Sequence, residues 1–196
     1  MKRLSGRWSQ TVMTMMDDAI YETGVLDKEV HGRLVADLSR YSRAANVPKR
    51  MIWTPLSENC SQQEIEWVRD IRLHSGDGVS GLVYVGELDP PALVRMSAIG
   101  GALLRNFIGV RMISVHRLIE EAKQTDPPET VLMVHDFHSS SVKLPKWQTG
   151  LLASALENRS VSEKQTILYA DSLDAVEQDY GPELVELIRR EYTVME

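Results

Sequence analysis

Apolar residues in the first part of the chain recur every three or four positions, which is the spacing of one face of a helix. They form two runs on either side of Gly24: Val12, Met16 and Ile20, then Leu26, Val30, Leu34, Leu38 and Tyr41. Pro48 and Pro55 interrupt the periodicity, because proline lacks a backbone N–H and clashes with the preceding helical turn. The pattern predicts a helical hairpin over residues 8–44 and an extended connector over 45–60.

After residue 60, short apolar runs alternate with segments of helical periodicity. The predicted strands span 81–85, 108–115, 130–134, 166–170 and 193–195. The predicted helices span 61–75, 90–106, 116–123, 144–155, 172–179 and 182–190. Strands separated by helices predict a parallel sheet with right-handed crossovers. The sequence therefore indicates a three-layer α/β domain over residues 46–196, preceded by a helical segment over 1–45.

Two local motifs bear on how these helices are built. Ser61 and Glu64 have the form of a capping box, in which a hydroxyl and a carboxylate satisfy free N–H groups at a helix start. Gly100 and Gly101 lie inside a helical pattern, where glycine costs stability relative to alanine. We expect this pair to allow the helix to pack closely on the sheet.

The length and composition indicate a globular protein with one sizeable core. A chain of 196 residues is too short for two large domains. It has no apolar run near the roughly 18 residues that span a membrane, and its first residues lack the pattern of a secretory signal. The single cysteine, Cys60, excludes an internal disulfide and a cysteine-based zinc site, so we expect a cytoplasmic protein.

The net charge of −6 is unevenly distributed along the chain. Residues 1–50 carry 9 basic and 6 acidic side chains, whereas the remainder carries 13 basic and 22 acidic ones. Nucleic-acid affinity depends largely on Lys and Arg, so the acidic body argues against extensive contact with phosphate groups. A local basic surface is still open as an alternative. Its candidates for binding single-stranded DNA are the basic first part of the chain and Arg105, Arg111 and Arg117.

Several short segments follow one another at a distinctive spacing. They are Asn46-Val47-Pro48-Lys49-Arg50, the helix from Ser61, the strand 82–85, the segment 110–119, the segment 165–171, the turn Asp179-Tyr180-Gly181 and the final residues 193–196. In order and spacing they resemble the ATPase domain of bacterial helicase loaders and transposition helper proteins, the DnaC/IstB-like branch of the AAA+ proteins. The resemblance implies a core of the P-loop NTPase and AAA+ type.

The segment that matches the family's phosphate-binding loop lacks most of the residues that bind ATP. Such a loop needs glycines, a lysine for the β- and γ-phosphates, and a Ser or Thr hydroxyl for Mg²⁺. Here only the first glycine, Gly86, is kept, and the lysine and hydroxyl positions hold Ala92 and Leu93. Glu87 and Asp89 place negative charge where a triphosphate would lie, and two prolines remove backbone donors. These replacements predict that ATP does not bind in the usual way.

The other nucleotide-site positions implied by the resemblance are altered as well. Of the paired acids at the end of the third strand, Asp136 matches the second, but His135 occupies the first, where a hard Mg²⁺ ion would need oxygen. Asp171 replaces the family's asparagine after the fourth strand, and the positions of the later arginines hold Glu183 and Leu187. We therefore expect no catalytic residue, no cofactor and no bound metal.

A cluster at the end of the third predicted strand offers a competing interpretation. His135, Asp136 and His138 could ligate a transition metal. However, alternate side chains of a strand face opposite ways, so three ligands within four residues do not converge. The neighbouring serines, 139–141, lack the surrounding glycines of a nucleophile elbow. A structural role is favoured for this cluster.

The best candidates for partner binding are aromatic and long apolar side chains near the N-terminus. They are Trp8, Met16, Tyr21 and Trp53. Aromatic residues often anchor interfaces, and the family's region before the ATPase domain contacts the helicase. The resemblance therefore implies a replicative helicase, or another AAA+ replication or transposition protein, as the partner. Self-association is an alternative, and no membrane contact is expected.

Together these features favour a pseudo-ATPase, a helicase-loader-like adaptor that works by protein–protein contact. It would act in DNA replication or in the biology of a phage or mobile element. Two alternatives stay open: a divergent nucleotide- or metal-dependent hydrolase, and an ATP-independent protein that binds single-stranded DNA.

Overall fold

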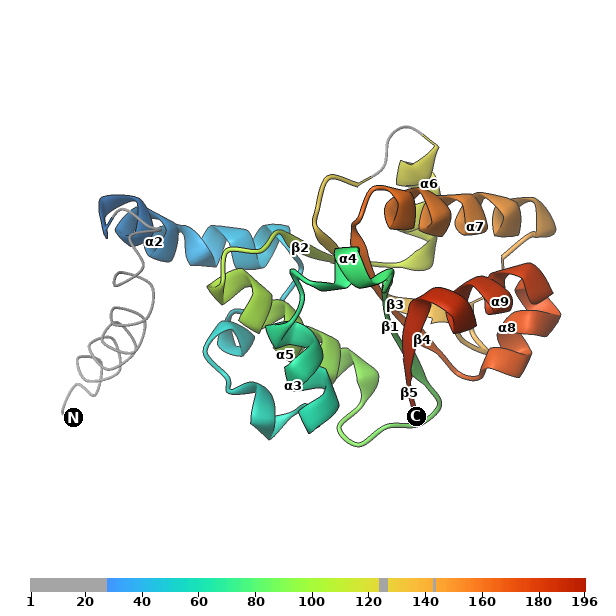
Figure 1. Cartoon of the computed structure of the whole chain (residues 1–196), viewed down its shortest axis with the longest axis horizontal. Helices are drawn as coiled ribbons and strands as arrows, with labels where there is room; N and C mark the ends of the chain where they lie inside the picture. The colour runs from blue at the N-terminus through green and yellow to red at the C-terminus, as the bar shows by residue number, and fades with distance from the viewer. Residues whose placement is uncertain (1–27, 124–126, 143) are drawn as a thin grey trace. The chain divides into compact units, whose positions relative to one another are not determined.

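The computed structural model describes residues 28–123, 127–142 and 144–196 (Figure 1). Residues 1–38 and 39–196 form two units, and the second, called the body below, is described by itself. The second helix of the expected hairpin is α2 (Lys28–Ala44), which runs across the boundary between the units. Its first helix, with Trp8, Met16 and Tyr21, lies outside the described residues.

The body is built on a five-stranded, all-parallel sheet. Its strands are β1 (Gly81–Val85), β2 (Val110–Ile113), β3 (Val131–His138), β4 (Gln165–Ala170) and β5 (Tyr192–Met195). They lie in the order β2-β3-β4-β1-β5. The predicted class, a parallel sheet flanked by helices, is confirmed.

Helices cover both faces of this sheet, as Figure 1 shows. The helices of the body after α2 are α3 (Gln62–Arg69), α4 (His74–Asp77), α5 (Ala92–Arg105), α6 (Val115–Ala122), α7 (Lys146–Val161), α8 (Leu173–Tyr180) and α9 (Pro182–Glu191). Strands β2, β3, β4 and β5 succeed one another in one direction across the sheet, whereas the connection from β1 to β2 runs across it in the opposite direction. With right-handed crossovers, α6 to α9 therefore cover one face and α5 covers the other.

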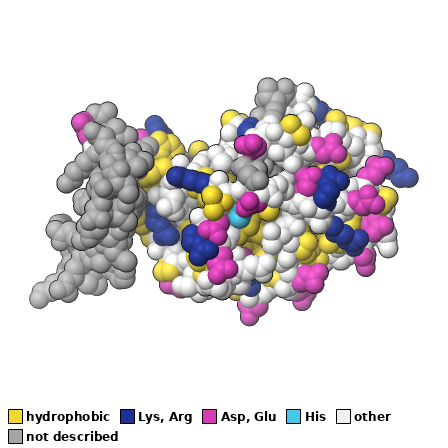
Figure 2. Space-filling view, viewed as in Figure 1, with side chains coloured by type: hydrophobic (Ala, Val, Ile, Leu, Met, Phe, Trp, Pro, Cys, Tyr) yellow, Lys and Arg dark blue, Asp and Glu magenta, His cyan; other side chains and the backbone are white. Residues whose placement is uncertain are grey.

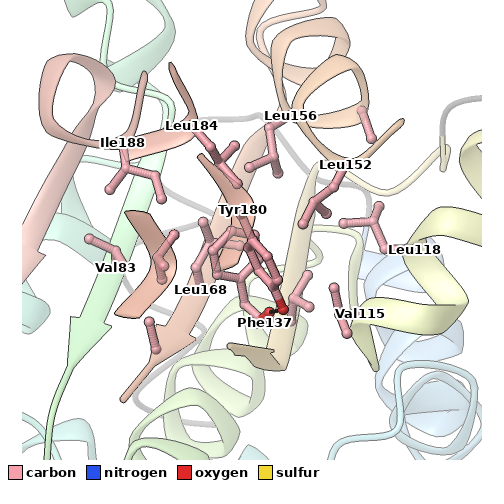
Figure 3. Close-up of a cluster of buried hydrophobic side chains, with 14 of the residues drawn as sticks. Val83, Val115, Leu118, Phe137, Leu152, Leu156, Leu168, Tyr180, Leu184 and Ile188 are labelled. Atoms are coloured by element: carbon pink, nitrogen blue, oxygen red, sulfur yellow. Dashed lines mark hydrogen bonds between the residues drawn. The ribbon is translucent and has the colours of Figure 1, made fainter. Parts of the chain in front are cut away.

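The main hydrophobic core lies between the sheet and the layer formed by α6 to α9 (Figure 3). Val83 and Leu168 from the strands and Leu152 of α7 all belong to this core and are fully buried. The rings of Phe137 and Tyr180 pack edge to face with centroids 5.8 Å apart. The Tyr180 hydroxyl donates a hydrogen bond of 2.9 Å to the Phe137 carbonyl, which satisfies its polar end inside the core.

Three predicted features of the chain path were wrong. The helix predicted over 61–75 ends at Arg69, and a separate short helix, α4, spans His74–Asp77. The connector 45–60 is not extended, because it contains the 3₁₀ turns η1 (Lys49–Ile52) and η2 (Leu56–Glu58). A proline precedes each turn with φ of −59°, an angle that suits entry into a helical turn. Strand β3 also continues beyond the predicted end at residue 134, through an irregularity in its pairing with β4, as far as His138.

The glycine pair in α5 does allow close packing, but on two different elements. A Cβ at Gly100 would lie 2.7 Å from Cε of Met133 in the sheet. A Cβ at Gly101 would lie only 2.1 Å from the carbonyl oxygen of Met51 in η1. The expected approach to the sheet is therefore accompanied by a closer approach to the connector.

Candidate functional site

A crevice is expected at the carboxyl ends of β1 and β4. The crossovers that leave these neighbouring strands run to opposite faces of the sheet, and α/β folds bind ligands at such a switch point. Gly86 follows β1 there with φ of +79°, a conformation that suits glycine. Its N–H donates to the carbonyl of Ala170 at the end of β4, 3.0 Å away. The stretch 86–91 between β1 and α5, called the β1–α5 loop below, begins at this bond.

The β1–α5 loop is closed by an arginine from the helix that follows it. Arg95 donates from Nη2 to the carbonyl of Asp89 at 2.7 Å and from Nε to the carbonyl of Pro90 at 2.8 Å. Its remaining terminal nitrogen, Nη1, lies 2.5 Å from the Glu64 carboxylate. Carbonyl oxygens of the loop are thus turned toward a cation supplied by the protein itself.

Glu64 is the buried centre of this arrangement, with its side chain fully shielded from solvent. Besides the Arg95 contact, it accepts from the backbone N–H of Ser61 at 2.6 Å, completing the predicted capping box of α3. It also accepts from the Tyr84 hydroxyl at 2.5 Å. Burial and the adjacent Glu64 carboxylate raise the pKa of Tyr84, so its hydroxyl stays a donor. The Glu64 cluster therefore joins α3, β1 and α5 beneath the loop.

The thiol of Cys60 lies at the edge of the same cluster. Its Sγ is 3.8 Å from the carbonyl of Arg95. Burial, with Glu64 nearby, raises the pKa of Cys60 to about 12. Because the thiolate is the reactive form, Cys60 is unsuited to nucleophilic chemistry.

Asp136 and His135 both lie in the carboxyl half of β3 but differ in their contacts. Asp136 accepts the backbone N–H of Val115 at 2.7 Å, which satisfies a free donor at the start of α6. His135 is partly exposed, and its Nδ1 is 4.0 Å from Asp136 Oδ1. The acid that the resemblance assigns to the second carboxylate position thus holds the start of a helix.

Asp171, at the end of β4, also binds backbone. It accepts from the N–H of Ser140 at 2.7 Å and from the Tyr169 hydroxyl at 3.2 Å. His138, by contrast, is buried, and its Nε2 lies 3.0 Å from the Asp179 carboxylate on α8. Across the described parts of the chain, no group of three His, Cys, Asp or Glu side chains could hold a metal ion.

Residues after the Tyr180-Gly181 turn complete the comparison with the nucleotide-site positions. Glu183 is exposed in the first turn of α9, whereas Leu187 is 4% exposed and belongs to the core. Neither side chain is a cation. Arg190, close to them in sequence, pairs with Glu191 instead.

The three arginines predicted to bind DNA have protein partners. Arg111 lies 2.5 Å from Glu121 and 3.0 Å from Glu129. Arg117 lies 2.6 Å from the same Glu121. Arg105 donates to the carbonyl of Ile52 at 3.0 Å, which places it beside η1. Arg111 and Arg117 thus share one carboxylate, whereas Arg105 bonds to the backbone of η1.

A second buried charge, Arg159 of α7, lies at the amino ends of the strands, opposite the end that carries the β1–α5 loop. It donates to the Thr166 hydroxyl at 3.0 Å and to the Gln165 carbonyl at 2.9 Å, both in β4. It also donates to the carbonyls of Pro127 and Glu129 before β3. Sequence reasoning missed it, although its position seven residues after Leu152 places it on the buried face of α7.

The sheet order, its parallel strands and its two helical layers define the class of the body as a P-loop NTPase-like α/β fold. No family model matches the sequence, and no curated protein matches it. Among solved structures, the chain is similar to the DnaC helicase loader, with a TM-score of 0.51 and 18% identity over 68% of this chain and 86% of the other.

The structure of DnaI is similar as well. Its TM-score is 0.52, with 16% identity over 76% of this chain and 90% of the other. At these identities the likeness shows a shared fold, and it confirms the fold that the sequence resemblance implied. No helix in the described ranges is long and apolar enough to cross a membrane.

Proposed function

We propose that this protein is a pseudo-ATPase adaptor, a helicase-loader-like protein that acts by protein–protein contact without hydrolysing ATP. It would serve DNA replication or a phage or mobile element. The observation that carries the proposal is the β1–α5 loop, whose carbonyls are bound by Arg95 at the place where a phosphate-binding loop presents N–H groups.

Electrostatics support this reading of the loop. Glu87 and Asp89 are exposed acids within it, and Pro90 and Pro91 have no N–H to offer a phosphate. Arg95 is the nearby cation, but a triphosphate would have to draw it away from Glu64. Removing one partner of a buried ion pair costs about 3–5 kcal/mol. The contacts of a bound nucleotide would therefore have to offset this free-energy cost before binding became favourable.

The altered acids argue against the alternative of a divergent hydrolase. Asp136 and Asp171 both accept backbone N–H groups at 2.7 Å. Asp136 uses Oδ1 for this bond, and Asp171 uses both of its oxygens for structural bonds, so the orientation of each carboxylate is set by the backbone that it holds. We expect the purified protein to hydrolyse no ATP above the buffer rate, with or without single-stranded DNA. Turnover that depends on Asp136 would refute the proposal.

The partner side of the proposal rests on the fold and on one exposed aromatic residue. The similar structures include a helicase loader, so a replicative helicase, or another AAA+ replication or transposition protein, is the proposed partner. Trp53 directly follows η1, and 41% of it is exposed. Large aromatic side chains of this kind often anchor interfaces.

Binding of the full chain to the purified replicative helicase of its host tests this partner. We expect the Trp53→Ala variant to bind about tenfold or more weakly, as is typical for loss of an aromatic anchor. Leu73→Ala is the control, because Leu73 is also exposed, at 63%, but lies at the start of α4. Absence of binding by the wild-type chain would exclude the helicase as the partner.

Single-stranded DNA binding is a second candidate function, favoured by the surface around η1. Arg43, Lys49 and Arg50 are exposed there with Trp53, and the chain has no acidic residue from 38 to 57. Basic groups with an aromatic ring suit a single strand, by charge and by base stacking. Fluorescence anisotropy with a single-stranded oligonucleotide tests this function. Lys49→Ala should lower the affinity and the dependence of binding on salt, whereas equal affinities of the wild type and the variant would exclude this surface.

A further inference from the structure

A cavity of about 330 Å³ lies at the amino ends of β2, β3 and β4, opposite the end of the sheet that carries the β1–α5 loop. Its wall includes Phe107 and Ile108 before β2, Thr130 before β3, and Gln165 at the start of β4. The backbone N–H of Gln165 donates to the carbonyl of Thr130 at 2.9 Å, so two parts of the wall are bonded to each other. The cavity is therefore shaped by the ends of the sheet itself.

Gln165 brings to this wall a buried acceptor that the protein does not satisfy. The residue is 2% exposed, and its Nε2 donates to the carbonyl of Val79 at 2.7 Å, which fixes the orientation of the amide. The other amide atom, Oε1, has no hydrogen-bond donor among the residues that the structure describes. A buried acceptor without a donor is unfavourable, so a ligand that supplies an N–H group would remove that cost.

Two other residues of the wall have a strained backbone conformation. Phe107 and Glu163 follow the ends of α5 and α7, with φ of 57° and 56°. Glycine is the usual residue at that place, because a side chain is disfavoured in the left-handed region. Three non-glycine residues have positive φ in the described parts of the chain, and two of them line this cavity. Strain of this kind points to a role for the side chains that are kept there.

The cavity wall carries one cation and one anion. Arg72, which precedes α4, and Glu163 are both exposed residues of the wall. Figure 2 shows basic, acidic and hydrophobic side chains intermixed on the face of the body where Figure 1 places α4. A phosphate group would be repelled by Glu163, and a simple cation would be repelled by Arg72. A small molecule that carries both charges and an apolar part suits this wall best.

We propose that this cavity binds a free α-amino acid with an apolar side chain. The carboxylate of the ligand pairs with the guanidinium of Arg72, a geometry that favours two parallel hydrogen bonds. Its ammonium group donates to Glu163 and to Oε1 of Gln165, and its side chain packs on Phe107 and Ile108. The cavity volume is at the lower end of the range of about 300–1,000 Å³ for small-molecule sites, which suits a ligand of this size. The site does not depend on the pseudo-ATPase proposal, and either can fail without the other.

Isothermal titration calorimetry of the full chain with L-phenylalanine and with L-leucine tests the site. We expect saturable binding of at least one of them with a Kd below about 1 mM. Phenethylamine lacks the carboxylate and 3-phenylpropionate lacks the ammonium group, so each should bind about tenfold or more weakly than L-phenylalanine. Absence of saturable binding by both amino acids would overturn the proposal. Equal affinity for N-acetyl-L-phenylalanine amide, which carries neither charge, would overturn it as well.

Two variants assign the charges of the ligand to the wall. Arg72→Gln should abolish the preference for L-phenylalanine over phenethylamine, and Glu163→Gln should abolish its preference over 3-phenylpropionate. Both side chains are exposed, so both variants should keep the circular dichroism spectrum of the wild type. Arg69→Gln is the matched control, because Arg69 is an exposed arginine that pairs with Asp70 and should leave binding unchanged. If Arg72→Gln and Glu163→Gln both kept the preferences of the wild type, the proposed site would be wrong.

Discussion

Replacing Arg95 by methionine probes the cluster that closes the β1–α5 loop. Methionine keeps much of the side-chain length but leaves Glu64, which is fully buried, without its cation. Loss of one partner of a buried pair costs about 3–5 kcal/mol. Tyr84 and the N–H of Ser61 still donate to Glu64, so we expect the lower end of that range, about 3 kcal/mol. For a body of this size the melting temperature should fall by roughly 6–12 °C.

Urea unfolding followed by circular dichroism measures this loss, and a double-mutant cycle assigns it. Glu64→Gln removes the charge that Arg95→Met leaves unpaired, so the double variant should be more stable than the sum of the two single losses by about 1 kcal/mol or more. Arg69→Met is the matched control, because Arg69 also pairs with a neighbouring acid, Asp70, but is 67% exposed and should change little. Additive losses, or equal effects of the two arginine changes, would refute the reasoning.

Three further predictions concern other parts of the structure. Gly101→Ala should destabilise the body by about 3 kcal/mol or more in urea unfolding, because the added Cβ would overlap the connector backbone. Gly32→Ala is the control and should be neutral or stabilising, because a Cβ there would meet no described atom within 4 Å. Arg159→Met should cost about 3 kcal/mol or more by calorimetry, since it strands several buried oxygens; a loss near zero would contradict its role. Burial alone would raise the pKa of the Glu121 carboxyl, but hydrogen bonds from Arg111 and Arg117 lower this pKa below 4.5. The contribution of Glu121 to stability is therefore present above pH 4.5 and is lost on further acidification. The stability difference between wild type and Glu121→Gln should therefore shrink as pH falls below 4.5, and a constant difference would count against the pairing.

Periodicity predicts most of the body because each element repeats its signal over several residues. The strand predicted over 166–170 corresponds to β4, and the one over 81–85 matches β1, since both are continuous apolar runs bounded by polar or turn residues. The end of β3 was missed because three of its last four residues, His135, Asp136 and His138, are polar. There the strand continues by pairing with β4 through an irregular register, which is a tertiary effect without a local pattern.

The contacts of the site were not predictable from the sequence. The assignment of Ala92 and Leu93 to the positions of the lysine and hydroxyl stays a prediction from the resemblance, whereas the contact that the structure shows there joins Glu64 to Arg95, which are 31 residues apart. One signal was available: Tyr84 lies in the middle of a buried strand, and a buried hydroxyl needs a polar partner. That requirement indicates that an acceptor must face β1, but not that Glu64 supplies it.

Isothermal titration calorimetry of the wild-type chain with Mg-ATP tests the central proposal, a loader-like fold that works without nucleotide. We expect no saturable heat, and no rise in melting temperature with Mg-ATP present, although a ligand at 100 times its Kd would stabilise the protein by about 2.7 kcal/mol. Mg-ADP should behave in the same way. A saturable isotherm with a micromolar Kd, accompanied by such a rise in stability, would contradict the pseudo-ATPase proposal.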